Sequence, residues 1–178
     1  MKKAIPLGIS DYRELQENNY YTIDKTMMIK EFLESKTKVT LITRPRRFGK
    51  TLNMSMMSEF FDITKDSQNL FKNTLIASTP YIHEMNKYPT IFMSFANAKG
   101  NKEITVEIIK KQILNAYKKN KEALNEIDFF DQSVYKGIID GLNDFRNGTL
   151  DDVVDALSFL MAQLESYYSK KAMVFMDE

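Results

Sequence analysis

One short run of residues has the types and the order needed to bind phosphate. Gly49, Lys50 and Thr51 end the segment RPRRFGKT, which begins at Arg44. A glycine lets the backbone come close to an anion, and N–H groups at the start of a helix converge on phosphate oxygens. The lysine can reach the β- and γ-phosphates of a nucleotide, and the threonine hydroxyl can bind Mg²⁺. The run therefore predicts a nucleotide-binding phosphate loop (P-loop) in which Lys50 also acts on the reacting phosphates.

The loop departs from the common motif GxxxxGK[ST] at its first glycine, where this chain has Arg44 followed by Pro45. That glycine mainly helps the chain leave the preceding strand, and Pro45 pushes Arg44 toward the extended conformation that such a path requires. Pro45 has no N–H group, but every residue from Arg46 to Thr51 has one. The replacement therefore alters the start of the loop more than the phosphate cradle. The predicted nucleotide contacts of the loop are Arg46, Arg47, Phe48, Gly49, Lys50, Thr51 and Leu52.

The two loop arginines, Arg46 and Arg47, are open to more than one role. They could contact phosphate, anchor the loop by pairing with carboxylates, or face a partner subunit. They lie in a stretch between Glu34 and Glu59 that has no acidic residue. A solvated basic face is one interpretation of this stretch, but around a phosphate loop its positive field would attract an anionic ligand. Its basic residues are Lys36, Lys38, Arg44, Arg46, Arg47 and Lys50.

Two acidic residues, Asp177 and Glu178, follow an apolar run near the other end of the sequence. In P-loop ATPases an acid at a strand end helps to hold Mg²⁺. A glutamate next to it can orient and deprotonate the attacking water. We therefore expect Asp177 to share Mg²⁺ with Thr51, and Glu178 to be the catalytic base. The alternative is a pair of exposed carboxylates with no catalytic role.

The elements that must position these residues follow from hydrophobic periodicity. The β-branched, apolar segment VTLIT (residues 39–43) predicts a buried strand before the loop, and a helix is expected from about Lys50. In the helix over residues 103–117 we expect Ile104, Ile108, Ile113 and Tyr117 to face inward. Strands separated by helices imply a mostly parallel sheet with helices on both faces. The further strands are expected at residues 89–95 and 172–178, and the further helices at 134–145 and 150–168.

Composition limits the class of protein. The chain has 178 residues, 43% of them hydrophobic, and a formal net charge of +1, which suits one globular domain and does not indicate nucleic acid. With no cysteine, disulfides and thiolate metal sites are excluded, which fits a reducing cytoplasm. The apolar run near the start is too short for a signal peptide, and no segment approaches the length of a membrane span. We expect a cytoplasmic protein that does not contact a membrane.

The sequence resembles the predicted AAA-ATPase-like proteins of bacteria, whose variant P-loop reads RPRRFGKT. The resemblance implies that Arg44 is normal at its position and that Asp177 and Glu178 are the family's acidic pair. It also places the segment before the P-loop strand near the adenine, so either Tyr20 or Tyr21 could stack on the base, and Tyr21 is the predicted nucleotide contact. The other matching pieces are IPLGISDYRELQENNYYTIDKT (residues 5–26), LFKNTLI (70–76) and MVFMDE (173–178).

The same resemblance implies an α/β fold, the three-layer αβα sandwich of P-loop NTPases. Relatives continue beyond the acidic pair with a further strand that carries a sensor residue, and many add a nuclease-like PD-(D/E)XK module. We therefore expect residues 1–178 to be the N-terminal part of one P-loop domain, incomplete at its C-terminus. Residues 1–36 would precede the P-loop strand, and residues 37–178 would form the core through the acidic pair.

Three functions are compatible with these features. The first is ATP binding with Mg²⁺-dependent hydrolysis. The second is a non-hydrolysing nucleotide-binding regulatory module. The third is a small-molecule kinase, which the tandem acids Asp177 and Glu178 disfavour because they point to water as the acceptor. A nucleotide is the expected ligand, and a homo-oligomer, or nucleic acid bound through a missing C-terminal module, are further partners that the resemblance suggests.

Overall fold

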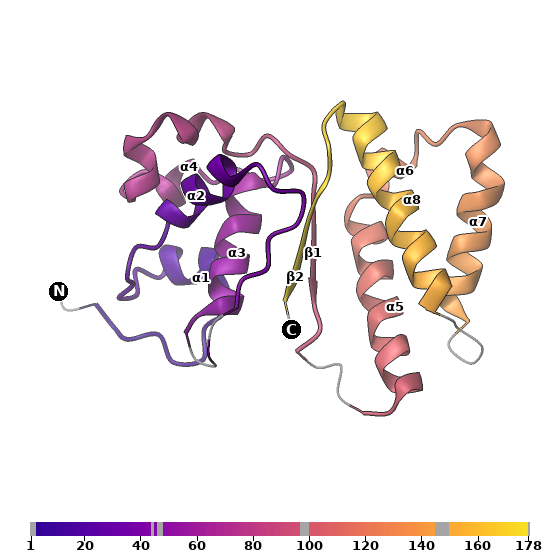
Figure 1. The fold of residues 1–178 in the computed structure, drawn as a ribbon, viewed down its shortest axis with the longest axis horizontal. Coiled ribbons are helices and arrows are strands. Elements are labelled where there is room, and N and C mark those ends of the chain that lie inside the picture. The colour runs from indigo at the N-terminus through magenta and orange to yellow at the C-terminus, as the bar shows by residue number, and fades with distance from the viewer. Residues whose placement is uncertain (1–2, 44, 46–47, 97–99, 145–149, 178) are drawn as a thin grey trace. The chain divides into compact units, whose positions relative to one another are not determined.

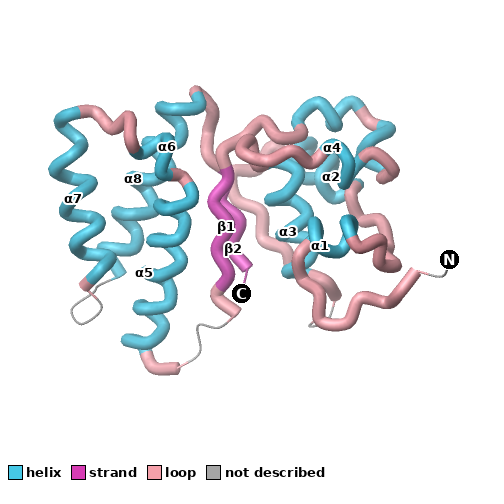
Figure 2. The backbone as a smooth tube through the Cα atoms, turned by 180° about the vertical axis from the view of Figure 1, so that it is seen from behind, coloured by secondary structure: helices cyan, strands magenta, loops and turns pink. Residues whose placement is uncertain are grey.

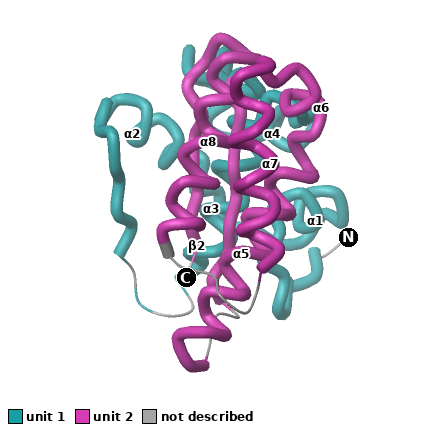
Figure 3. Tube along the Cα trace, turned by 90° about the vertical axis from the view of Figure 1, so that its right-hand side faces the viewer, with its two compact units in different colours: residues 1–87 teal, residues 88–178 magenta. Residues whose placement is uncertain are grey.

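The computed structural model describes residues 3–43, 45, 48–96, 100–144 and 150–177. The chain forms two compact units, Met1–Lys87 (unit 1) and Tyr88–Glu178 (unit 2) (Figure 3). Most of the regular structure is helical, and one pair of strands lies in unit 2 (Figure 2). The prediction that both units belong to one P-loop domain, with residues 1–36 preceding its core, stays a prediction.

Unit 1 consists of short helices around an aromatic core (Figure 1). The ring of Phe71 stacks on Tyr12 with centroids 5.1 Å apart and meets Phe60 edge-on at 5.2 Å. Asp11 caps the first helix by accepting a hydrogen bond from the Glu14 amide at 2.8 Å. The elements are α1 (Tyr12–Glu17), α2 (Met27–Ser35), α3 (Lys50–Phe61), α4 (Gln68–Phe71) and the 3₁₀ helices η1 (Leu75–Ser78) and η2 (Pro80–Glu84).

The helix expected after the loop is confirmed, because α3 begins at Lys50. Its buried face includes Met56, Met57, Phe60 and Phe61, which recur at helical spacing. These side chains belong to the core of unit 1, and their burial fixes the position of the helix that follows the loop.

The strand predicted at residues 39–43 is wrong. This segment has no regular secondary structure, and the side chains of Val39 and Leu41 are 85% and 84% exposed. A strand is stabilised by pairing with a neighbour, so the preference of β-branched residues is realised only where a partner strand lies alongside. In the described part of the chain no strand pairs with this segment.

Unit 2 contains β1 (Thr90–Ser94) and β2 (Met173–Asp177), as expected from the two apolar segments. The strands pair in parallel, from Thr90 opposite Met173 to Ser94 opposite Asp177. The connection between them contains α5 (Lys102–Lys119), α6 (Lys121–Leu124), α7 (Phe129–Asn143) and α8 (Leu150–Tyr168). Figures 1 and 2 show these helices on one side of the strand pair. The mixed α/β class is thus confirmed, whereas the three-layer sandwich stays a prediction.

The inward face of α5 differs from the one predicted. Ile113 and Tyr117 are buried as expected, but Ile104 is 46% exposed. The buried stripe runs instead through Val106 and Lys110, and it follows steps of four and three residues to Ile113 and Tyr117. Because a lysine occupies the middle of the stripe, hydrophobicity alone did not reveal it.

Within the described ranges, no helix has both the length and the apolar character that crossing a lipid bilayer requires.

Candidate functional site

The start of α3 has the conformation that a phosphate loop needs. Gly49 is the N-cap residue, with φ 74° and ψ 29°, a left-handed backbone conformation that residues with a Cβ atom rarely adopt. The Asn53 amide donates to the Gly49 carbonyl at 2.9 Å, which closes the first turn. A helix leaves the N–H groups of its first turn without intrahelical acceptors, and Gly49 has no side chain to cap them. The helix start can therefore receive an anion.

The structure describes six of the predicted nucleotide-binding residues, all of them in unit 1: Tyr21, Phe48, Gly49, Lys50, Thr51 and Leu52. Lys50, Thr51 and Leu52 form the first turn of α3 and are half-buried. Phe48 and Tyr21 are each 59% exposed, and the Tyr21 backbone is held by a hydrogen bond from its amide to the Ala4 carbonyl at 2.8 Å. The predicted contacts through Arg46 and Arg47, and the role of Arg44, lie outside the described residues.

A lysine that sequence reasoning did not place at the site contacts the loop. The Lys25 ammonium donates a hydrogen bond to the Phe48 carbonyl at 3.3 Å. A Cβ atom added to Gly49 would lie 3.7 Å from the same ammonium. The residues around Lys25 give only a weak sequence signal for this contact.

The residues on either side of Lys25 fix its position. The Asp24 carboxylate accepts hydrogen bonds from the Thr26 amide at 2.8 Å and the Leu75 amide at 2.7 Å. The Thr26 hydroxyl, which is buried, accepts from the Ile76 amide at 3.0 Å. The N-cap position of α2 is held by Thr26, two residues after Asp24. Both side chains attach this turn to η1.

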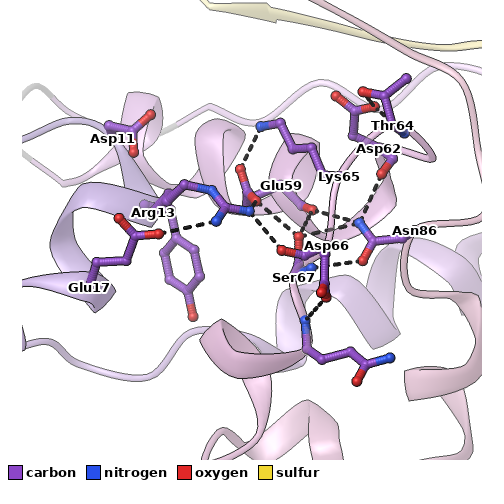
Figure 4. Close-up of polar contacts among 12 residues, drawn as sticks. Asp11, Arg13, Glu17, Glu59, Asp62, Thr64, Lys65, Asp66, Ser67 and Asn86 are labelled. Carbon is purple, nitrogen blue, oxygen red and sulfur yellow. Dashed lines mark hydrogen bonds and ion pairs between the residues drawn. The ribbon is translucent and has the colours of Figure 1, made fainter.

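The other end of α3 is held by a buried carboxylate (Figure 4). Glu59, whose side chain is 3% exposed, pairs with Arg13 from α1 at 2.5 Å and with Lys65 at 2.5 Å. It also accepts a hydrogen bond from the Ser67 hydroxyl at 2.9 Å. Burial is the largest single influence on the pKa of Arg13 and lowers it, but hydrogen bonds and charges from Glu59 and then Glu17 together raise that pKa above its ordinary value. The charge of Glu59 is thus used in holding α1 and the segment after α3 together.

Further hydrogen bonds connect the segment after Glu59 (Figure 4). Asn86 donates its side-chain amide to the Asp62 carbonyl at 2.8 Å and accepts from the Ser67 amide at 3.0 Å. The Asp62 carboxylate accepts from the Thr64 amide and hydroxyl at 3.0 and 2.7 Å. Among the described residues, no group of three or more His, Cys, Asp or Glu side chains could hold a metal ion. We interpret the cluster as structural support for α3.

The acid expected at the end of a strand lies in unit 2. Asp177 is the last residue of β2 and is 3% exposed, and the Ser94 hydroxyl donates to its carboxylate at 3.5 Å. The Asp177 carbonyl accepts from the Phe95 amide at 2.6 Å, which extends the pairing beyond the strand. The predicted catalytic residue Glu178 lies outside the described residues. The metal site shared by Thr51 of unit 1 and Asp177 of unit 2 stays a prediction.

Comparison with known proteins gives the family. The sequence model of a family described as "Predicted AAA-ATPase", named AAA-ATPase-like, matches residues 6–178. The chain belongs to the AAA-ATPase-like family. Membership confirms the resemblance to this family.

A curated relative of this AAA-ATPase-like chain is the "Uncharacterized protein in vnfD 5'region" of Azotobacter chroococcum mcd 1. It is 38% identical over 61 residues, which are 34% of this chain and 12% of the relative. The match therefore spans about an eighth of the length of that protein. No solved structure matches the chain significantly.

Proposed function

We propose that this AAA-ATPase-like chain binds ATP at the start of α3. The observation that carries the proposal is the left-handed Gly49 directly before Lys50 and Thr51. These residues lie at the N-terminus of α3, whose C-terminal half is buried in the core of unit 1. Backbone N–H groups of the first turn would bind phosphate oxygens, and Lys50 would extend to the β- and γ-phosphates. The exposed rings of Phe48 and Tyr21 are available to contact the nucleotide, with Tyr21 stacking on the base.

We propose further that the bound ATP is hydrolysed with Mg²⁺. The Thr51 hydroxyl and the Asp177 carboxylate are the hard oxygen ligands that this ion prefers. Held by these two side chains, Mg²⁺ would supply positive charge to stabilise the negative charge that develops on the phosphate oxygens. Glu178 would take a proton from water, whose oxygen then bonds to the γ-phosphorus while the bond to the bridging oxygen of ADP breaks. A non-hydrolysing regulatory module is the alternative, and the two differ in turnover.

The nucleotide site is tested by calorimetry of ATP binding to full-length wild type and Lys50→Ala. Loss of charge-assisted hydrogen bonds to phosphate, each contributing about 1.5–3 kcal/mol, should weaken binding by about 10- to 100-fold. Equal affinity of the two proteins would contradict the proposed site.

Hydrolysis is tested with Glu178→Gln in the same protein. ATP affinity should be unchanged, while turnover should fall by about 10²–10⁴-fold because general-base assistance is lost. A wild type that binds ATP tightly without turnover would favour the regulatory alternative. Turnover that does not change in the variant would exclude Glu178 as the base.

The variant start of the loop is tested with Arg44→Gly, which restores the common motif. We expect equal or weaker ATP affinity, because glycine loosens the backbone and one positive charge is removed. The difference should shrink as salt rises, since salt screens the lost charge. Clearly tighter binding by the variant would show that Arg44 impairs the cradle.

A further inference from the structure

The peptide group between Phe48 and Gly49 needs an external restraint. Rotating this group changes φ of Gly49 together with ψ of Phe48. Glycine has no Cβ, so it accepts either sign of φ at almost equal energy. Nothing in the local covalent structure therefore selects the orientation seen here, with φ of Gly49 at 74°.

The Lys25 ammonium supplies a restraint of this kind. It lies 3.3 Å from the Phe48 carbonyl oxygen, within hydrogen-bond distance. The backbone at Lys25 is held in place because the side chains of the neighbouring residues, Asp24 and Thr26, both accept hydrogen bonds from backbone amides of η1. Among the described residues this ammonium makes no other hydrogen bond or ion pair, so the carbonyl is its protein partner there.

The orientation of this peptide group decides whether the loop accepts an anion. In a trans peptide the C=O and N–H bonds point in opposite directions. Holding the Phe48 oxygen against Lys25 therefore directs the Gly49 N–H away from that lysine. A reversed peptide group would exchange the two and present a partial negative charge where the N–H donor now points. For a phosphate, that change replaces attraction by repulsion.

We propose that Lys25 is a positioning residue of the nucleotide-binding loop, which fixes the Phe48–Gly49 peptide group with its N–H available to phosphate. The inference rests on the proposed ATP site at α3. It gives Lys25 a role distinct from that of Lys50, because Lys25 acts through the backbone and Lys50 acts on the phosphates.

The first measurement needs no nucleotide. Full-length protein labelled with ¹⁵N at glycine is compared as wild type, Lys25→Met and Lys30→Met. Lys30 is the matched control, because it lies in α2, which follows the turn, and its ammonium pairs with the Glu34 carboxylate at 3.8 Å. The Gly49 amide resonance should shift or broaden in Lys25→Met and stay unchanged in Lys30→Met. An unchanged Gly49 resonance in both variants would overturn the proposal.

The second measurement is ATP affinity in the same three proteins at low and high salt. Lys25→Met should weaken ATP binding by about 3- to 10-fold, the equivalent of one net hydrogen bond. The ratio to wild type should persist at high salt, because the lost restraint acts through geometry and not through a screened field. Lys25→Arg, which can also donate to the carbonyl, should recover most of the affinity.

The outcomes separate this inference from the proposed function. If Lys50→Ala loses ATP and Lys25→Met binds as tightly as Lys30→Met, the role of Lys25 is wrong and the site stands. If the loss of ATP affinity in Lys25→Met disappears at high salt, Lys25 acts only through its long-range electrostatic field, and this result would also overturn the proposal. If wild type does not bind ATP, the proposed function fails, and the positioning role for nucleotide falls with it.

Discussion

Glu59 in unit 1 and Lys110 in unit 2 are buried ionised side chains whose charges are compensated in different ways. In unit 1 the Glu59 carboxylate is met by two cationic side chains, Arg13 and Lys65, which are themselves 36% and 31% exposed. In unit 2 the Lys110 ammonium, 1% exposed, donates to the backbone carbonyls of Gly141 at 2.7 Å and Asp144 at 3.0 Å. It also approaches the Asp152 carboxylate at 3.4 Å.

The difference lies in what happens to the partners when the buried charge is removed. Arg13 and Lys65 are on long side chains that already reach water, so they can turn outward and be hydrated. The carbonyls of Gly141 and Asp144 belong to the end of α7 and move only if the helix end moves. A buried charge held by the backbone should therefore be harder to replace than one held by flexible side chains.

The largest effect is expected from Lys110→Ala. The variant leaves two carbonyls at the end of α7 without their donor and opens a void beside Val106 and Ile113, so the free energy of unfolding should fall by about 3 kcal/mol or more. Urea denaturation measures the loss, and hydrogen exchange should show it concentrated in peptides of unit 2. Lys110→Met, which fills the void but donates nothing, should lose less. A loss below about 1 kcal/mol for Lys110→Ala would remove the contrast between the units.

Glu59→Ala should come next, with a loss of about 2 kcal/mol in the same assay. The buried carboxylate and its hydrogen bond from Ser67 are lost, but both cations can be hydrated. A double-mutant cycle with Arg13→Ala would give the coupling between Glu59 and Arg13 directly. A loss larger than that of Lys110→Ala would reverse the comparison and show that unit 1 depends more on its buried ion.

Alkaline pH should weaken both units through a buried tyrosine in each. Burial is the largest cause that raises the pKa of Tyr12 in unit 1 and of Tyr117 in unit 2 above the ordinary value. The unfolded chain would lose these protons first, so the stabilisation is complete below about pH 10 and declines as pH rises above it.

Spectrophotometric titration of the chain's nine tyrosines should show late ionisation that Tyr12→Phe and Tyr117→Phe each reduce. At neutral pH, Tyr117→Phe should also cost about 1 kcal/mol, because the hydroxyl donates to the Ala156 carbonyl at 2.7 Å. Ionisation of all tyrosines near their ordinary pKa, in protein that is still folded, would contradict the expected burial.

The smallest effect is expected from Glu17→Ala. Glu17 pairs with the same Arg13 at 3.1 Å, but its side chain is 55% exposed. An exposed pair of this kind should contribute less than about 0.5 kcal/mol in urea denaturation. The variant is thus the control for Glu59→Ala, and similar losses for the two would mean that burial is not what makes Glu59 important.

Several elements could be predicted because their signals are local. The start of α3 at Lys50 follows from a glycine before an amphipathic segment, and the strands over residues 90–94 and 173–177 follow from short apolar runs. The start of α8 at Leu150 was also expected.

Other features depend on partners that are distant in the sequence. Residues 39–43 have strand-forming side chains, but an extended segment becomes a strand only when another strand pairs with it. Lys110 is buried because the end of α7, more than thirty residues later, supplies carbonyl acceptors. Periodicity treats a lysine as polar and so misses a lysine whose charge is matched inside the fold.

The sequence by itself determined the family, the RPRRFGKT loop and the places where its local signals are strong. It also determined that Gly49 is the residue able to take a left-handed conformation before α3, because this property belongs to glycine itself. Only the tertiary structure decided which charges are buried and which cation contacts the loop. Glu59, Lys110 and Lys25 owe their roles to atoms brought together by folding, and hydrogen bonds between such atoms depend on distance in space and not on order along the chain.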